Sequence, residues 1–167
     1  LKDLAAKTRR GQRGRVEAGK IPGGNSYGYK IVRRVLDNGS VSTGEREIDP
    51  SQAAIVKRIF QEYAEGLAPR QIAGRLNKEN ILGPRGGPWN ASTINGSRQR
   101  RNGILNNELY LGHITYNRQR FIKDPETGKR RSRLNPEQEW VITEVPALRI
   151  VDDKAWRSVQ TIKSRYT

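Results

Sequence analysis

The stretches PRQIAGRLNKEN, residues 69–80, and WNASTI, residues 89–94, carry the prediction of the fold. The first stretch begins with proline, which suits the first turn of a helix, and its apolar residues recur at helical spacing. In the second stretch, Asn90 or Ser92 can cap a further helix, which we expect to cover residues 90–101. Two short helices in this order predict the last two members of a three-helix, helix-turn-helix unit, although their connecting loop is longer than in the simplest units.

The first helix of this unit precedes the pair and supplies its packing surface. Asp49 followed by proline is typical of a helix start, and Gly66 ends the segment. Between these two residues the apolar side chains recur at i, i+3 and i+4, which is the pattern of a helix that buries one face in a core. The stripe consists of Ile55, Val56, Ile59, Phe60 and Tyr63.

Strand patterns lie on both sides of the helical segment. Residues 27–31 alternate as a strand does, and the Asp-Asn-Gly turn that follows returns the chain to a partner strand over residues 41–48. Residues 113–121 and 140–145 predict a second hairpin or small sheet, with turn residues at 124–128 between them. A last helix follows Asp152-Asp153. The predicted fold class is α+β: a helical, helix-turn-helix-like core with β-hairpins.

The N-terminal segment, residues 1–24, has a composition of its own. It begins as a helix tail and continues as a basic arm, because Gly11, Gly14 and Gly19 lower the helical propensity. The Pro-Gly-Gly-Asn cluster then ends the segment. We therefore divide the chain into residues 1–24 and residues 25–167. Since the sequence contains no Met and opens at Leu1, we expect it to be part of a longer protein.

The charge balance points to a polyanionic partner. The 167 residues include 32 Lys and Arg against 17 Asp and Glu, which gives a formal net charge of +15. Such an excess favours nucleic acid, because each neutralised phosphate releases a condensed counterion. A solubility surface or an anionic membrane are the alternatives. No apolar stretch has the length of a membrane-spanning helix, no secretory signal opens the chain, and the absence of Cys excludes disulfides and thiolate metal sites.

The positive charge is concentrated in three segments: residues 1–20, 85–101 and 118–133. Residues 45–65 and 135–153, in contrast, are net acidic. This sorting predicts a single basic face assembled from distant parts of the chain. The alternative is a set of solvated loops that are basic without a common role.

The candidate DNA-binding residues follow from these segments. Polar and basic side chains over residues 92–100 have the chemistry that recognises base edges, although an ordinary helical core with a polar face is the alternative. Arg side chains spaced by Gly over residues 9–15 suit a minor groove, and a disordered basic tail is the alternative. The candidates are Arg9, Arg10, Arg13, Arg15, Arg85, Ser92, Thr93, Asn95, Arg98, Arg100, Arg101, Arg118 and Arg120.

No pattern indicates a catalytic centre, a metal site or a cofactor site. His113 is the single histidine, so no His pair is available as metal ligands or a proton relay. The Gly-rich residues 83–87 lack the Lys of a phosphate-binding loop, and Asp152-Asp153 resembles a helix cap. Trp89 could stack on a base, but its position before a helix favours a core anchor.

A series of short motifs resembles the DNA-binding "recombinase" domain of large serine recombinases and the junction that precedes it. The similarity covers nearly the whole chain, and the order and spacing of the motifs make it specific. The matching residues are Lys7-Thr8-Arg9-Arg10-Gly11, Gly19-Lys20, Tyr27-Gly28-Tyr29, Ile72-Ala73, Leu76-Asn77, Trp89, Ser92-Thr93-Ile94, Leu105-Asn106-Asn107, Tyr110-Leu111-Gly112, Tyr116-Asn117-Arg118, Ile150-Val151-Asp152 and Trp156.

The resemblance implies a role in DNA recombination or integration by a mobile element. In such enzymes a Ser nucleophile in an upstream domain forms a phosphoserine link, and subunits paired on each site assemble into a tetramer. This chain would be the non-catalytic part that binds double-stranded DNA at attachment sites. It would be a bacterial or phage-derived protein that lies in the cytoplasm and associates with the nucleoid. Residues 1–24 would be the end of the inter-domain helix with a linker arm, and residues 25–167 the DNA-binding domain. A zinc ribbon would be absent or would follow Thr167.

One departure from the family pattern concerns the segment after the third helix. Relatives often pass from the Thr-Ile pair to the Leu-Asn pair with little between, whereas here the segment from Asn95 to Gly103 adds residues 96–101. The addition would shorten the helix and leaves open whether Arg98, Arg100 and Arg101 contact bases or phosphates. The alternative functions are a helix-turn-helix transcriptional regulator and a basic RNA-binding protein; a self-contained nuclease ranks last.

Overall fold

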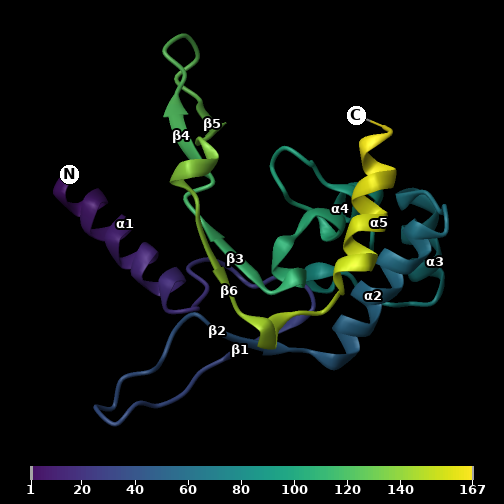
Figure 1. Cartoon of the computed structure of the whole chain (residues 1–167), viewed down its shortest axis with the longest axis horizontal. Coiled ribbons are helices and arrows are strands. Elements are labelled where there is room, and N and C mark those ends of the chain that lie inside the picture. The colour runs from purple at the N-terminus through teal and green to yellow at the C-terminus, as the bar shows by residue number, and fades with distance from the viewer. Residues whose placement is uncertain (1, 167) are drawn as a thin grey trace.

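The computed structural model describes residues 2–166, and within them it shows five α-helices and three two-stranded antiparallel sheets (Figure 1). The helices are α1 (Lys2–Glu17), α2 (Pro50–Ala64), α3 (Pro69–Lys78), α4 (Ala91–Asn95) and α5 (Asp153–Ser164). The strands pair as β1 (Tyr29–Val32) with β2 (Glu45–Ile48), β3 (His113–Tyr116) with β6 (Val141–Glu144), and β4 (Gln119–Lys123) with β5 (Arg130–Leu134). The predicted α+β class is confirmed.

The core lies between α2, α3, α5 and two 3₁₀ turns, Ile104–Asn106 and Glu108–Leu111. The predicted α2 stripe is buried there, with Ile55 partly covered. Tyr29 of β1 reaches into the core, where its hydroxyl lies 2.6 Å from the Leu148 carbonyl oxygen and 2.8 Å from that of Leu109. Burial raises the pKa of Tyr29 far above its ordinary value, because the charged phenolate would be desolvated. The first hairpin is thereby fixed to the centre of the molecule.

The prediction of a basic arm after the helix tail was wrong. The helix α1 continues through Gly11 and Gly14 to Glu17. Glycine in an exposed helix costs about 1 kcal/mol, and two contacts compensate for it at this end. Arg13 and Glu17 form an i, i+4 ion pair at 2.9 Å, and Val16 is fully buried where α1 packs against β3 and β6.

The predicted third helix was too long. The helix α4 ends at Asn95, because Gly96 has φ 53° and ψ −152°, outside the helical region. Residues 97–102 then form a loop, and Gly103, with φ 82°, returns the chain to the core. The basic residues of this segment therefore lie on a loop instead of on the helix.

The predicted pairing of residues 113–121 with residues 140–145 is confirmed for β3 and β6, but the first strand ends at Tyr116 and a separate hairpin follows it. The turn at residues 124–128 joins β4 to β5, while β3 pairs with the more distant β6. The strand β5 escaped prediction because its sequence, RRSRL, offers no apolar face. The β4–β5 hairpin, called the ribbon below, stands away from the helical body and points upward in Figure 1. No helix within residues 2–166 is long and apolar enough to cross a membrane.

Candidate nucleic-acid interface

The start of α4 is capped by Asn90. Its side-chain oxygen accepts hydrogen bonds from the Thr93 amide at 2.8 Å, the Thr93 hydroxyl at 2.9 Å and the Ser92 hydroxyl at 2.7 Å. Such a cap fixes the first turn of a helix that is too short to be stable alone. It also leaves the Ser92 side chain exposed at the surface.

A shallow hollow of about 800 Å³, called the α4 hollow, lies beside this helix. Its wall combines α4, the 97–102 loop and the Gly-rich loop before α4. Arg85, with its backbone at φ 62°, stands exposed on the Gly-rich loop. The polar lining includes Arg85, Ser92, Thr93, Ser97, Arg101 and Asn102.

The 97–102 loop is closed tightly at its base. Gly96 and Gly103 approach so closely that a Cβ on Gly103 would lie 2.6 Å from the Gly96 Cα. The side-chain amide of Asn106 donates to the carbonyl oxygens of Asn95 and Asn102, both at 2.8 Å. The loop therefore has a fixed base, and its residues 98–100 project into solvent.

Arg101, in contrast, turns inward to a carboxylate that it shares with Arg118. The Arg101 guanidinium pairs with Glu108, and Arg118 lies 3.3 Å from the other Glu108 oxygen. Both guanidinium groups also lie over the ring of Trp140, with Arg101 4.5 Å from its centroid. Burial lowers the pKa of Arg118, although Glu108 opposes this shift. These two arginines connect the loop to the base of the ribbon.

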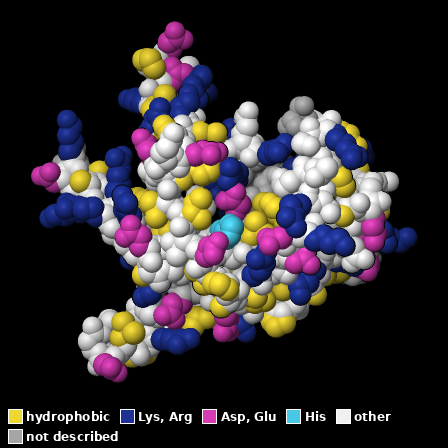
Figure 2. Space-filling model, viewed as in Figure 1, with side chains coloured by type: hydrophobic (Ala, Val, Ile, Leu, Met, Phe, Trp, Pro, Cys, Tyr) yellow, Lys and Arg dark blue, Asp and Glu magenta, His cyan; other side chains and the backbone are white. Residues whose placement is uncertain are grey.

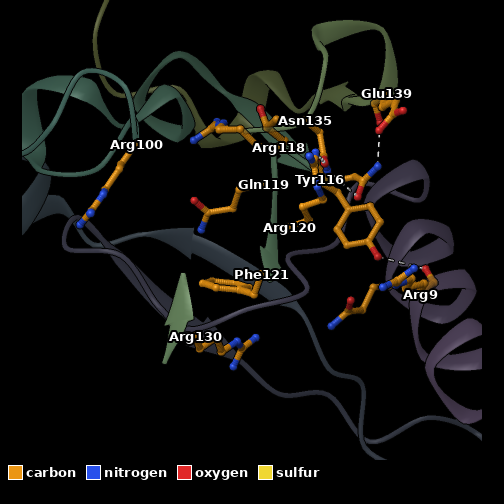
Figure 3. A pocket seen from close by; sticks show the side chains of 13 residues that line it. Arg9, Arg100, Tyr116, Arg118, Gln119, Arg120, Phe121, Arg130, Asn135 and Glu139 are labelled. Carbon is orange, nitrogen blue, oxygen red and sulfur yellow. Dashed lines mark hydrogen bonds between the residues drawn. The ribbon is translucent and has the colours of Figure 1, made fainter. Parts of the chain in front are cut away.

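A second hollow, of about 710 Å³, lies between α1, the ribbon and the 97–102 loop and is called the ribbon hollow (Figure 3). Arg9 from α1 and Arg100 from the loop approach it from opposite sides, and Arg120, Phe121 and Arg130 belong to the ribbon. The hydroxyl of Tyr116 donates to the Arg9 carbonyl oxygen at 3.4 Å, at the side of α1 that packs against β3. Three segments that are distant in sequence therefore meet here.

Most of the predicted site residues gather at the two hollows, but some do not. Arg9, Arg100, Arg118 and Arg120 line the ribbon hollow, and Arg85, Ser92, Thr93 and Arg101 line the α4 hollow. Arg10, Arg13 and Arg15 are exposed along α1. Lys and Arg side chains gather over this helix, at the left of Figure 2. Arg98 lines a smaller depression beside α5.

Asn95 is held by the last helix. Lys163 of α5 donates to the Asn95 carbonyl oxygen at 2.7 Å and to its side-chain oxygen at 2.9 Å. Sequence reasoning missed several residues that line the hollows: Gln12, Ser97, Asn102, Phe121 and Arg130. Arg130 lies in a segment whose positive charge was noted, but only the strand register brings it to the ribbon hollow.

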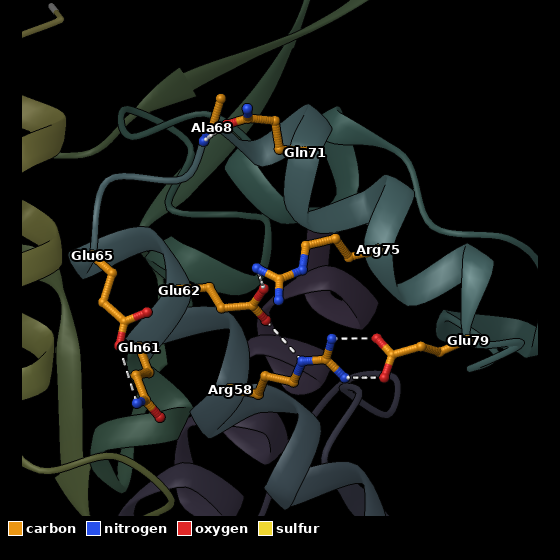
Figure 4. Close-up of polar contacts among 8 residues, drawn as sticks. All are labelled: Arg58, Gln61, Glu62, Glu65, Ala68, Gln71, Arg75 and Glu79. Carbon is orange, nitrogen blue, oxygen red and sulfur yellow. Dashed lines mark hydrogen bonds and ion pairs between the residues drawn. The ribbon is translucent and has the colours of Figure 1, made fainter.

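The helices beneath α4 are fixed to one another by ion pairs (Figure 4). Arg58 of α2 binds Glu62 on its own helix, at 2.7 Å, and Glu79 after α3. Glu62, which is nearly buried, also pairs with Arg75 of α3 at 2.9 Å. Because these contacts are charge-assisted and partly buried, they hold α3 at a defined angle to α2.

Beyond α3, Asn77 extends this scaffold to the start of α4. Its amide donates to the Trp89 carbonyl oxygen and its oxygen accepts from the Trp89 amide, both at 2.8 Å. Trp89 itself is buried against Tyr27, with their ring centroids 4.9 Å apart. Trp89 is therefore a core anchor, as the sequence favoured. Within residues 2–166, no group of three or more His, Asp or Glu side chains is placed to hold a metal ion.

Comparison with known proteins places the chain in a family. A family model described as Recombinase matches residues 50–165. A chain in the crystal structure of an LSR–DNA complex, LSR denoting a large serine recombinase, is similar with a TM-score of 0.56 and 20% sequence identity. The similarity covers 93% of this chain but 37% of that chain, so the present chain spans little more than a third of its length. No curated protein gives a significant sequence match. Since the family model covers more than half of the residues, the chain belongs to the Recombinase family.

Proposed function

We propose that the chain binds double-stranded DNA at recombination sites, as the non-catalytic part of a serine site-specific recombinase. The observation that carries this proposal is the convergence of three basic segments on two neighbouring hollows, which share the 97–102 loop. Arginines at such a surface neutralise phosphates and release their counterions. The fold similarity to a chain from an LSR–DNA complex supports the same interpretation.

The α4 hollow is the part of the surface suited to recognise sequence. Arg85 offers a bidentate donor pair that matches guanine, and Ser92 and Thr93 offer hydroxyl groups for bases or phosphates. A helix-turn-helix unit presents side chains of this kind to the major groove. The Ser92 hydroxyl already donates to Asn90, so it remains available as an acceptor.

The proposal is tested by binding to duplexes of random sequence, followed by selection of preferred sites from that library. We expect the logarithm of the binding constant to fall with the logarithm of salt concentration with a slope of about −5 or steeper, as for six or more phosphate contacts. The double substitution Arg98→Ala/Arg100→Ala should weaken binding. Affinity that is independent of salt would contradict the proposal.

Two alternatives have separate tests. Competition between duplex DNA and duplex RNA separates DNA binding from RNA binding, because the deep, narrow major groove of A-form RNA excludes a recognition element. A transcriptional regulator would bind DNA in the same way, so the encoded sequence upstream of Leu1 distinguishes it from a recombinase. Assembly into dimers on a site and tetramers in synapsis, and association with the nucleoid, belong to the proposed parent protein.

A further inference from the structure

The ribbon has little support from the rest of the fold. All five residues of β4 and four of the five in β5 are exposed, with Ser132 half-buried. Phe121 and Leu134 are 50% and 47% exposed, so the ribbon leaves apolar side chains open to solvent. A two-stranded hairpin without a packed face is marginally stable in water. This exposure indicates that the ribbon acts against a partner outside the chain.

The charge of the ribbon identifies the chemistry of that partner. Six basic residues lie between positions 119 and 134, against two acidic ones. Asp124 is already used, since it pairs with Arg131 at 2.8 Å and accepts the Glu126 amide at 2.9 Å. The basic residues are Arg120, Lys123, Lys129, Arg130, Arg131 and Arg133. An excess of this size matches a polyanion.

The register distributes these cations over both faces of the ribbon. Phe121 lies opposite Ser132 and Lys123 opposite Arg130, so these four residues share one face, and Phe121 and Arg130 of this face line the ribbon hollow. There the Arg130 guanidinium lies 3.9 Å from the centroid of the Phe121 ring. Arg131 and Arg133 occupy the other face. Positive charge is therefore available on either side of the strands.

We propose that the ribbon, together with the facing side of α1, is an arm that binds the phosphate backbone of the duplex outside the base pairs contacted at the α4 hollow. The inference rests on the proposed function and divides its surface into two parts. Guanidinium and ammonium groups outnumber the amide and hydroxyl groups on the ribbon, and phosphate contacts position a protein without reporting sequence. Arg9 and Arg130 line the same hollow, so α1 and the ribbon can approach one strand together.

The base of the ribbon is closed by contacts that do not involve residues 119–134. The Asn135 amide donates to the Arg118 carbonyl oxygen at 2.9 Å, and its side chain donates to the Asn117 carbonyl oxygen at 2.9 Å. The Trp140 indole donates to the Asn135 carbonyl oxygen at 3.1 Å. These contacts close the chain below the strands, so a Gly-Gly link between Arg118 and Asn135 replaces residues 119–134 without crossing the core.

The test compares three proteins of the full chain with the wild type: the Gly-Gly deletion, the triple variant Arg130→Ala/Arg131→Ala/Arg133→Ala, and a control. The control, Lys57→Ala/Lys154→Ala/Arg157→Ala, removes equal charge from exposed positions on α2 and α5 that line neither hollow. Binding to a selected site and to a random duplex is measured over a range of salt concentrations, and circular dichroism verifies folding.

We plot the logarithm of the binding constant against the logarithm of salt concentration. The ribbon triple variant should make the negative slope of this plot shallower by about 2 to 3, and the deletion should do so by at least as much. Both variants should weaken binding to the two duplexes by the same factor, while the control changes the slope by less than about 1. An unchanged slope, or loss of discrimination between the two duplexes, would overturn the inference and leave duplex binding itself standing. If the wild type binds neither duplex, the proposed function fails and the inference with it.

Discussion

Lys163 holds the C-terminal end of α4, since its ammonium group donates to both the carbonyl oxygen and the side-chain oxygen of Asn95. Lys163 is 7% exposed, and burial, with a smaller contribution from Arg98, lowers its pKa from 10.5 to about 8. The last helix of the chain is thereby connected to the helix beside the proposed base-recognition surface. Burial of the charged ammonium group is unfavourable, so the contribution of Lys163 to stability should depend on pH.

The lowered pKa of Lys163 should appear in the pH dependence of the free energy of unfolding. Between about pH 8 and about pH 10.5 the unfolded chain keeps the proton that the folded chain has released, so the free energy of unfolding rises with pH in this window. Below it both states are protonated and the full cost of burial remains. The rise approaches about 1.4 kcal/mol per pH unit. Urea unfolding from about pH 7.5 to about pH 9.5 measures it.

The control for this experiment is Lys163→Met, which keeps an unbranched side chain one atom shorter and removes the titrating group. Its free energy of unfolding should lack the rise. Tyr29 and Tyr110, whose pKa values are raised by burial, act with the opposite sign but only above about pH 10, where unfolded tyrosine ionises. Parallel curves for wild type and Lys163→Met would refute the assignment.

The close approach of Gly96 and Gly103 at the base of the 97–102 loop gives a second prediction. Substituting Gly96→Ala places a Cβ against the Asn102 carbonyl group, at a residue whose φ is 53°. We expect a loss of about 1–3 kcal/mol in stability, and weaker DNA binding because the loop that carries Arg100 loses its fixed base. Thermal unfolding and binding titrations measure the two effects. Gly14→Ala, where nothing lies within 4 Å, is the matched control and should leave both properties unchanged or slightly improved.

Glu108 supplies a third prediction, because it is the carboxylate between Arg101 and Arg118. Glu108→Gln leaves two partly buried guanidinium groups without their shared counter-charge. We expect stability to fall by about 1–2 kcal/mol, less than for a fully buried pair because both arginines keep some solvent contact. Chemical denaturation measures the fall. Glu65→Gln, at an exposed position of the same charge, is the control, and an equal effect of both substitutions would contradict the role of Glu108.

The sequence allowed the helical part of the fold to be predicted because its signals are local. Asp49 before proline and the apolar stripe of α2 each act within a few residues, and the structure places them as expected. The extent of α4 could not be obtained in this way. It depends on Gly96 meeting Gly103, which are brought together by Asn106, a contact between residues that no helical periodicity relates.

In the candidate site too, features set by neighbouring residues could be predicted, whereas features set by contacts between distant residues could not. The three basic segments were recognisable from composition, but their meeting at the ribbon hollow depends on β3 pairing with β6 and on α1 packing across both strands. The length of α1 was mispredicted because the low helical propensity of its glycines is visible in the local sequence. The burial of Val16 against distant strands, which stabilises the helix, is not. Asn95, predicted as a DNA-binding residue, accepts two hydrogen bonds from Lys163, a contact between residues that lie far apart in the sequence.

The last prediction concerns Asn77, which connects α3 to the segment entering α4. Its amide group makes two complementary hydrogen bonds with the main chain of Trp89. Asn77→Asp keeps the acceptor for the Trp89 amide but sets a carboxylate oxygen against the Trp89 carbonyl oxygen, whereas Asn77→Ala removes both bonds without repulsion. Asp should therefore destabilise the fold by at least as much as Ala, by about 1–3 kcal/mol. Because the same bonds orient the start of α4, both variants should also lose sequence discrimination while keeping salt-dependent binding to random duplexes. If Asn77→Asp had the same free energy of unfolding and selected the same sites as the wild type, the two hydrogen bonds between Asn77 and Trp89 would have no role in positioning α4.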